Sequence, residues 1–157
     1  YNFARIGSFI ERADNTARIL DVKYYVLLPA VSYVGSSLDN VQWENVLRSV
    51  AGERAYRWLN AGRMDQRGIA EFMLLDGRFP RSLAFCYAKL RSNLASLARE
   101  YGEEMESHHI LRNADSELHS LTVDAIFDQG LHEFIGRFIA HNTQLALQIQ
   151  RDYRFVE

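Results

Sequence analysis

One stretch near the start of the chain decides the fold: residues 5–23 read RIGSFIERADNTARILDVK. Apolar side chains recur in this stretch at intervals of three and four residues, which is the spacing of a buried stripe along one helix. The stripe consists of Ile6, Phe9, Ile10, Ala13, Ala17, Leu20 and Tyr24. Polar side chains flank it on both sides, because each residue is rotated by about 100° from the last. One flank carries Glu11, Asp14, Arg18 and Asp21, and the other carries Arg5, Arg12 and Thr16.

The composition is that of an ordinary globular domain. The chain has 157 residues, so we expect one domain over residues 1–157. A formal net charge of −2 provides no broad positive field, which argues against nucleic acid as a partner. No apolar run approaches the roughly 20 residues that span a membrane, and no signal peptide is recognisable. We therefore expect a cytoplasmic protein that does not bind membranes.

The chain contains one cysteine, Cys86, between Phe85 and Tyr87. A single cysteine cannot form an intrachain disulfide and fits a reducing compartment. Its aromatic neighbours and the lack of an obvious charged partner predict a packed thiol and not a nucleophile.

The pattern along the chain predicts an all-α bundle of about five to seven helices, of which the first, middle and last are long. The first helix is expected over residues 2–28, because Pro29 pushes the residue before it away from helical geometry. Residues 30–39 are expected to form a loop. Asp39 or Asn40 would then cap a short second helix.

Later helix boundaries are predicted from glycine, proline and capping residues. Gly52 is expected to end the second helix, and short helices follow over residues 53–60 and 65–76, the latter capped by Asp65. Pro80 suits the first turn of the middle helix, which would end at Gly102. This helix carries a heptad-like seam of Leu83, Tyr87, Leu90, Leu94, Leu97 and Tyr101.

Two more helices are expected over residues 104–127 and 129–153. The last has an apolar stripe of Leu131, Phe134, Ile135, Phe138, Leu145 and Ile149. Asn142 falls inside this stripe, where a polar side chain needs partners, so it is expected to form an interhelical hydrogen bond or to contact a ligand. No stretch of alternating β-branched residues indicates a strand.

Several segments of the chain resemble the bacterial Alpha-E domain family, an all-helical family with a Glu-Arg motif. They are IGSFIERAD at residues 6–14, TARILDVK at 16–23, AEFMLLD at 70–76, FPRS at 79–82 and QGLHEF at 129–134. The resemblance extends over essentially the whole chain and implies an all-α fold. One departure is Ser8, because in this family a basic residue often follows the glycine.

Members of this family look about twice as long, with the Glu-Arg helix once in each half. The resemblance therefore implies that the chain is the C-terminal half of a two-repeat protein. Family members resemble accessory proteins that accompany ATP-grasp amide-bond ligases and transglutaminase-like proteins. The resemblance thus implies a bacterial, peptide-modifying system in which this domain takes part in protein–protein interactions.

The acidic flank of the first helix is open to two interpretations. The residues Glu11, Asp14, Arg18 and Asp21 stack at helical spacings, so Arg18 can pair with either aspartate and leave Glu11 unpaired. A carboxylate beside other acids and an apolar face can acquire the raised pKa of a general acid or base, which makes Glu11 the catalytic candidate. The alternative is a ladder of structural ion pairs.

Basic residues at two places suggest anion binding. Arg5 and Arg12, with planar guanidinium groups, could bind a carboxylate or phosphate, or dock on acidic residues of the other half of the protein. Arg78 and Arg81 lie where a helix is expected to begin, and basic residues there need an acidic partner. That partner is either a ligand, with Ser82 adding a hydroxyl, or an internal acid such as Glu71 or Asp76.

No metal site or cofactor is expected. Glu106 and His109 form one Glu-x-x-His pair, whereas a di-iron bundle needs two pairs and further carboxylates. The sequence lacks Gly-x-Gly-x-x-Gly, Walker-type and Gly-x-Ser-x-Gly motifs. His132 and Glu133, near the start of the last helix, are expected to be solvated or to contact a loop.

Three hypotheses follow. The leading one is an accessory domain that presents Glu11, Arg12, Asp14, Arg18 and Arg81 to a peptide, a carboxylate or a partner protein such as an ATP-grasp ligase. The second is an enzyme that uses Glu11 in acyl or amide transfer. The third is a purely structural module, which would form a homo-oligomer to cover an exposed apolar patch.

Overall fold

A computed structural model describes residues 1–25 and 36–155 of the chain. Within these residues it contains eight helices and no strand, so the all-α prediction is confirmed and the predicted number of helices was close. The helices are α1 (Asn2–Tyr25), α2 (Ser37–Ser49), α3 (Glu53–Leu59), α4 (Gln66–Leu74), α5 (Leu83–Tyr101), α6 (Glu106–Ser120), α7 (Val123–Gln129) and α8 (Leu131–Asp152).

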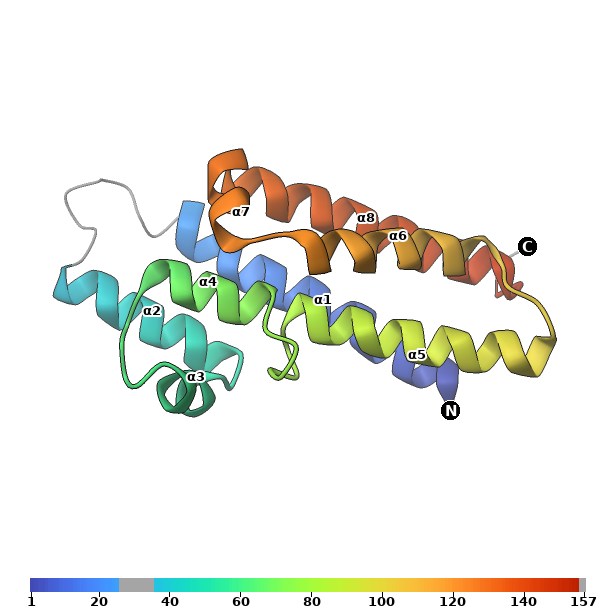
Figure 1. The fold of residues 1–157 in the computed structure, drawn as a ribbon, viewed down its shortest axis with the longest axis horizontal. Helices are drawn as coiled ribbons and strands as arrows, with labels where there is room; N and C mark the ends of the chain where they lie inside the picture. The colour runs from blue at the N-terminus through green and yellow to red at the C-terminus, as the bar shows by residue number, and fades with distance from the viewer. Residues whose placement is uncertain (26–35, 156–157) are drawn as a thin grey trace.

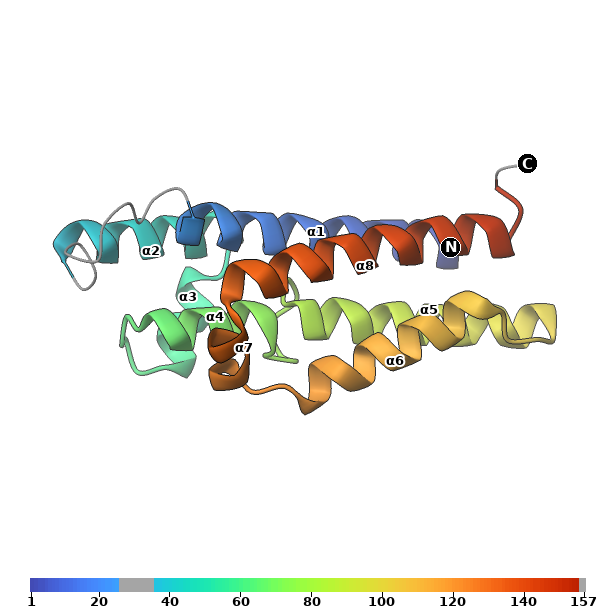
Figure 2. The ribbon, with the colours of Figure 1, turned by 90° about the horizontal axis from the view of Figure 1, so that it is seen from above.

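The four long helices α1, α5, α6 and α8 form an elongated bundle, and the short helices gather at one end of it (Figure 1). Helix α1 packs on both α5 and α8, and α6 closes the bundle by packing on the same two helices. Seen from above, α1, α2 and α8 lie in one layer and α4, α5 and α6 in the other (Figure 2). Helix α1 therefore has neighbours on two sides, while its remaining face is exposed.

The core is one continuous cluster that follows the predicted stripes. The stripe of α1 is buried at Ile6, Phe9, Ala13, Ala17 and Leu20. Ile10 is half-buried, and the side chain of Tyr24 lies outside the described residues. All predicted stripe residues of α8 are buried, as is the seam of α5 except for Tyr101, which is 57% exposed.

The polar residue in the α8 stripe is satisfied as predicted. The Tyr87 hydroxyl donates a hydrogen bond to Asn142 Oδ1 over 3.2 Å, and Asn142 Nδ2 donates to the carbonyl oxygen of Ile10 over 3.0 Å. Asn142 thereby joins α8 to α5 and to α1 in the middle of the bundle. The interhelical hydrogen bond is confirmed.

Three predicted boundaries around α2 need comment. The predicted helix end at Pro29 lies outside the described residues. The loop prediction is wrong at residues 37–39, because Ser36 and not Asp39 or Asn40 caps α2: its side chain accepts a hydrogen bond from Asp39 N. The prediction that Gly52 ends α2 is also wrong. Ala51 takes the left-handed conformation, with φ 53°, and Gly52 begins the next helix.

Gly52 is instead required for close packing. A Cβ atom there would lie 2.9 Å from the Phe79 ring and 3.1 Å from the Phe72 ring. These two rings are stacked, with centroids 4.2 Å apart. Glycine lets the corner between α2 and α3 sit directly on this aromatic pair.

Later boundaries were predicted with mixed success. Asp65 caps α4 and Gly102, with φ 80°, ends α5, as expected. The prediction that Pro80 opens the middle helix is wrong, because Ser82 is the N-cap and α5 begins at Leu83. The single helix expected over residues 104–127 is also wrong. The chain breaks after α6, and the Thr122 side chain caps a separate helix, α7.

Candidate functional site

The exposed flank of α1 is divided between two kinds of contact. Arg18 pairs with Asp14 on the surface, with nitrogen–oxygen distances of 2.7 and 3.3 Å. Asp21 does not join this pair: its Oδ1 lies 2.6 Å from Nδ1 of His132 on α8. The default expectation of a solvated His132 or a loop contact is therefore wrong. Glu11 is exposed and has neither a hydrogen bond nor an ion pair in the described part of the chain.

The opposite flank of α1 is built around Phe9. The guanidinium of Arg12 lies 5.0 Å from the centroid of the Phe9 ring, and that of Arg5 lies 5.3 Å from it. Cation–π contacts of this kind orient a guanidinium without neutralising it. Arg12 also donates a hydrogen bond from NH1 to the carbonyl oxygen of Pro80 over 3.2 Å. This bond brings the Glu-Arg segment of α1 against the loop that precedes α5.

That loop satisfies most of its polar groups internally. Arg78 donates to both carboxylate oxygens of Asp76, from Nε over 3.0 Å and from NH2 over 2.8 Å. These side-chain hydrogen bonds hold the pKa of Asp76 below its usual value, in spite of its partial burial. The Ser82 hydroxyl donates to the Asp76 carbonyl oxygen over 2.6 Å and accepts from Phe85 N. Arg78 thus has the internal acid that the sequence suggested, and Ser82 is the buried cap of α5.

Arg81 differs from Arg78. It is exposed and makes neither a hydrogen bond nor an ion pair with any described residue. Burial raises the pKa of the Cys86 thiol to about 12, and the nearby charges of Arg12 and Arg81 act in the opposite direction. Arg12 and Arg81 therefore both lie near Cys86, on the same side of the bundle. The packed thiol expected for Cys86 is confirmed, because its side chain is buried.

Three cations lie over a pair of phenylalanine rings where α1 meets α5, and Arg81 lies near Cys86 beside them. The rings of Phe9 and Phe85 are 6.3 Å apart, and Lys89 Nζ lies 5.3 Å from the centroid of Phe85. We call the set of Arg5, Arg12, Arg81 and Lys89, together with Phe9 and Phe85, the cationic surface. None of its four cations forms an ion pair with a carboxylate among residues 1–25 and 36–155. This surface is the candidate functional site.

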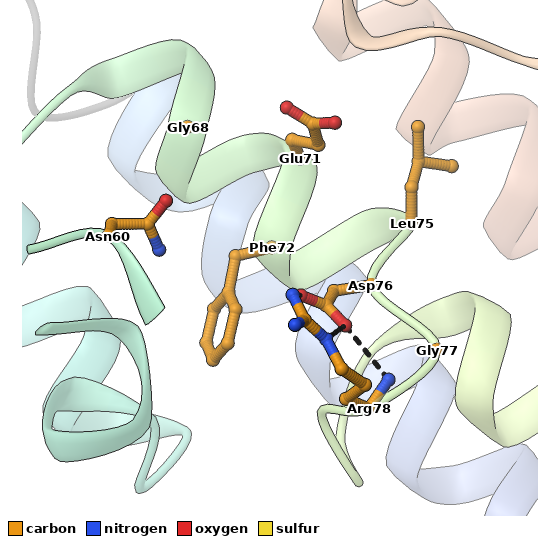
Figure 3. A pocket seen from close by; sticks show the side chains of 8 residues that line it. All are labelled: Asn60, Gly68, Glu71, Phe72, Leu75, Asp76, Gly77 and Arg78. Atoms are coloured by element: carbon orange, nitrogen blue, oxygen red, sulfur yellow. Dashed lines mark hydrogen bonds and ion pairs between the residues drawn. The ribbon is translucent and has the colours of Figure 1, made fainter. Parts of the chain in front are cut away.

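A polar pocket lies beside the same loop (Figure 3). It has a volume of about 380 Å³ and is lined by Asn60, Gly68, Glu71, Phe72, Leu75, Asp76, Gly77 and Arg78. In the figure, the Asp76–Arg78 pair closes one end and Asn60 lies across from α4. Glu71 is exposed and forms no ion pair in the described residues, so it does not serve as the expected partner of Arg78 or Arg81.

One buried ion pair was missed by the sequence analysis. Lys23 Nζ lies 2.6 Å from Asp39 Oδ1, and the side chains are 0% and 6% exposed. Lys23 also donates to Gln42 Oε1 over 2.8 Å and lies 4.9 Å from the centroid of the Trp43 ring. The signal was its position, three residues after Leu20 and seven after Thr16 on the buried side of α1.

A second missed residue is His108. Its Nδ1 accepts a hydrogen bond from Met105 N over 3.0 Å, and its Nε2 lies 2.9 Å from the Leu94 carbonyl oxygen. Because the Met105 N–H donates to Nδ1, the Nε2–H of the ring donates to the Leu94 carbonyl oxygen. His108 therefore joins the start of α6 to α5. No cluster of three or more metal-ligating side chains occurs in the part of the chain that the structure describes.

None of the described helices combines the length and the apolar character that crossing a membrane requires.

A family model described as a predicted alpha-helical domain with a conserved ER motif, named Alpha-E, matches residues 1–154. The chain belongs to the Alpha-E family. No curated protein and no solved structure matches the chain.

The Alpha-E chain contains two Glu-Arg pairs, Glu11-Arg12 and Glu53-Arg54, and the two pairs make different contacts. Glu53 Oε2 lies 2.7 Å from Nε of Arg48, and Arg54 is exposed on α3. Glu11 and Arg12 lie on α1, where Arg12 reaches the loop before α5. Adjacent residues point about 100° apart on a helix, and only Arg12 of the first pair faces the cationic surface.

Proposed function

We propose that this Alpha-E domain is an accessory domain that binds a carboxylate-bearing partner, an acidic protein segment or peptide, through the cationic surface. The observation that carries the proposal is that the four cations of this surface, three of them over the Phe9 or Phe85 ring, have no carboxylate partner among the described residues. In line with the family resemblance, the partner we propose is an ATP-grasp amide-bond ligase, or its peptide, in a bacterial cytoplasmic system. We further propose that the chain is one half of a two-repeat protein.

The cationic surface suits an acidic partner for a physical reason. Arg5 and Arg12 are held over the Phe9 ring, so binding requires less ordering of their side chains than for extended surface arginines. Arginine offers planar, two-pronged hydrogen bonding that matches a carboxylate. The chain as a whole carries a net charge of −2, which disfavours a long polyanion such as nucleic acid and favours a local contact.

Binding of two probes, a purified ATP-grasp ligase and a short polyglutamate peptide, tests this proposal. Arg12→Gln and Arg81→Gln should each weaken binding about tenfold or more, because charge-assisted hydrogen bonds contribute about 1.5–3 kcal/mol. Arg18→Gln is the matched control, since Arg18 is already paired with Asp14 on the other flank. Affinity for both probes that is equal in all three variants would refute the proposal.

The enzyme hypothesis has less geometric support. Glu11 is exposed on α1, and it does not line the polar pocket beside α4. A general acid or base needs a site that holds a substrate proton within hydrogen-bond reach. The paired Arg18 is on the same exposed face, where it is 58% exposed.

A structural role is the second candidate, and apolar exposure favours it. Val22, Leu38 and Val41 are each more than half exposed, at 51%, 55% and 52%, and Trp58 is 85% exposed. We expect a homo-oligomer if these side chains on α1, α2 and α3 are covered by a second copy. Sedimentation equilibrium of the parent chain and of Val41→Glu tests this: a monomer in both cases would refute it.

A further inference from the structure

A groove between α6 and α8 contains none of the residues of the cationic surface. It consists of two adjoining hollows, of about 40 and 270 Å³, that share Tyr87, Ala114, Glu117 and His141. Helices α6 and α8 form its walls, and Tyr87 of α5 contributes to its base. The larger volume is close to the lower limit of small-molecule sites, roughly 300 Å³. Its size suits a ligand about as large as an amino acid and not a nucleotide.

The base of the groove is aromatic and fixed in place. The ring of Tyr87 is 5.1 Å from that of Phe138, and Phe134 lines the smaller hollow beside them. The Tyr87 hydroxyl is held by Asn142, so the ring cannot rotate away without losing a buried hydrogen bond. Burial also raises the pKa of Tyr87 above its usual value, which keeps the base of the groove uncharged.

Opposite charges lie on the two walls. Glu117 is on α6, and Arg137 and His141 are one turn apart on α8. Although Glu117 and Arg137 line the same hollow, neither forms an ion pair within the described residues. Arg137 donates instead to the neutral oxygen of Gln129 over 3.2 Å. Each of these two opposite charges is therefore without an ion-pair partner among the described residues.

We infer that this groove binds a small zwitterion with an apolar side chain, namely an α-amino acid or a short peptide with free termini. The apolar side chain rests on Tyr87 and Leu145 in the larger hollow, and the ammonium group lies at Glu117. The carboxylate lies at His141, which both hollows share, and reaches Arg137 at the smaller hollow. Such a ligand supplies a group of opposite charge to both Glu117 and Arg137, which an apolar molecule or a simple anion does not do. This site is independent of the proposed function of the cationic surface.

Isothermal titration calorimetry with L-phenylalanine and two blocked analogues tests the assignment. Acetylation removes the positive charge of the ammonium group, and amidation removes the negative charge of the carboxylate. We expect L-phenylalanine to bind, and the affinity of each blocked form to be at least about tenfold lower. The dipeptides Phe-Gly and Gly-Phe separate the two sources: equal or tighter binding of one dipeptide identifies a peptide end, and weaker binding of both identifies the free amino acid.

Variants of Glu117 and Arg137 test which residue contacts each charged group of the ligand. In Glu117→Gln, L-phenylalanine should bind about tenfold more weakly, and acetylation of its amino group should then cause no further loss. In Arg137→Gln, amidation should likewise cause no further loss. Glu106→Gln and Arg151→Gln are matched controls on the same two helices, outside the groove, and should bind as the parent does. Absence of binding by the folded parent chain, or losses equal in groove and control variants, would overturn the inference.

Discussion

Cys86 is buried on α5, and burial raises the pKa of its thiol to about 12 although Arg12 and Arg81 act in the opposite direction. The thiolate is the form that reacts with alkylating and disulfide reagents. We expect the folded chain to react negligibly with a thiol reagent at pH 8 and to react at the ordinary rate in denaturant. Rapid stoichiometric labelling of the folded chain, at a rate independent of unfolding, would contradict this.

Asp76 is the residue for which a pH dependence follows from the structure. Hydrogen bonds from the Arg78 side chain are the largest cause of its lowered pKa. A carboxylate with a lowered pKa in the folded state stabilises the fold above its unfolded pKa of about 3.9, and this contribution is lost as the pH falls through the folded pKa. The stability difference between the parent and Asp76→Asn should therefore be constant near neutrality and shrink below about pH 4.

Chemical denaturation at a series of pH values measures that difference. A carboxyl titration by NMR should show the pKa of Asp76 rising toward its usual value in Arg78→Gln. Arg81→Gln is the matched control, because Arg81 belongs to the same loop and forms neither a hydrogen bond nor an ion pair with Asp76 among the described residues. A stability difference that does not change with pH would refute the role of Arg78.

Among the helices, the joint between α1 and α2 depends on the buried pair of Lys23 and Asp39. Removing one partner of a buried pair leaves an uncompensated charge and costs about 3–5 kcal/mol. We expect Lys23→Met to lose about this much free energy of unfolding, and the double variant Lys23→Met/Asp39→Leu to regain part of it. Arg18→Met is the control, because the exposed Arg18–Asp14 pair is worth about 0–1 kcal/mol. Equal losses in Lys23→Met and Arg18→Met in denaturant unfolding would contradict the buried role.

The helices with clear apolar stripes could be predicted from the sequence, and those set by local capping could not. Helices α1, α5 and α8 follow from periodicity, since packing and pattern agree in them. The break between α6 and α7 was missed because Thr122 competes with a helical pattern that continues on both sides. The start of α2 was predicted too late, because Ser36 caps the helix about one turn before Asp39 or Asn40, the two caps that were predicted.

The candidate site was predicted in its parts and not in its assembly. Arg12 was predicted to bind an anion because of its position on the flank of the first helix, and Arg81 because it lies where a helix was expected to begin. In the structure both residues lie near Cys86. Lys89 was not chosen, since nothing in its local sequence shows that it lies over the Phe85 ring. Asp21 was one of two possible partners for Arg18, and its actual partner His132 could not be predicted because it comes from the far end of the chain. Contacts between segments far apart in the chain cannot be predicted from the pattern of a single sequence.

At the scale of the whole molecule, Asn142 connects three of the four long helices. Its loss leaves the buried Tyr87 hydroxyl without an acceptor, and such an orphaned group costs about 1–3 kcal/mol. We expect Asn142→Ala to be destabilised by at least this amount and to be non-additive with Tyr87→Phe. Thr143→Ala, at the neighbouring exposed position of α8, is the control. Additive losses in a double-mutant cycle by urea unfolding would show that the two side chains are not coupled.

The first and last described turns of the chain lie against each other. The Phe3 ring is 4.9 Å from both the Tyr153 and the Phe155 rings, and Figure 1 shows the start of α1 and the end of α8 at the same end of the bundle. Adjacent ends at a surface make circular permutation feasible. A permutant with the present ends joined by a glycine-serine linker, and with new ends opened between α3 and α4 at the exposed Gly62, should keep the helical circular dichroism and cooperative melting of the parent. The same proximity would let this domain be inserted into a loop of a host protein without spreading that loop apart.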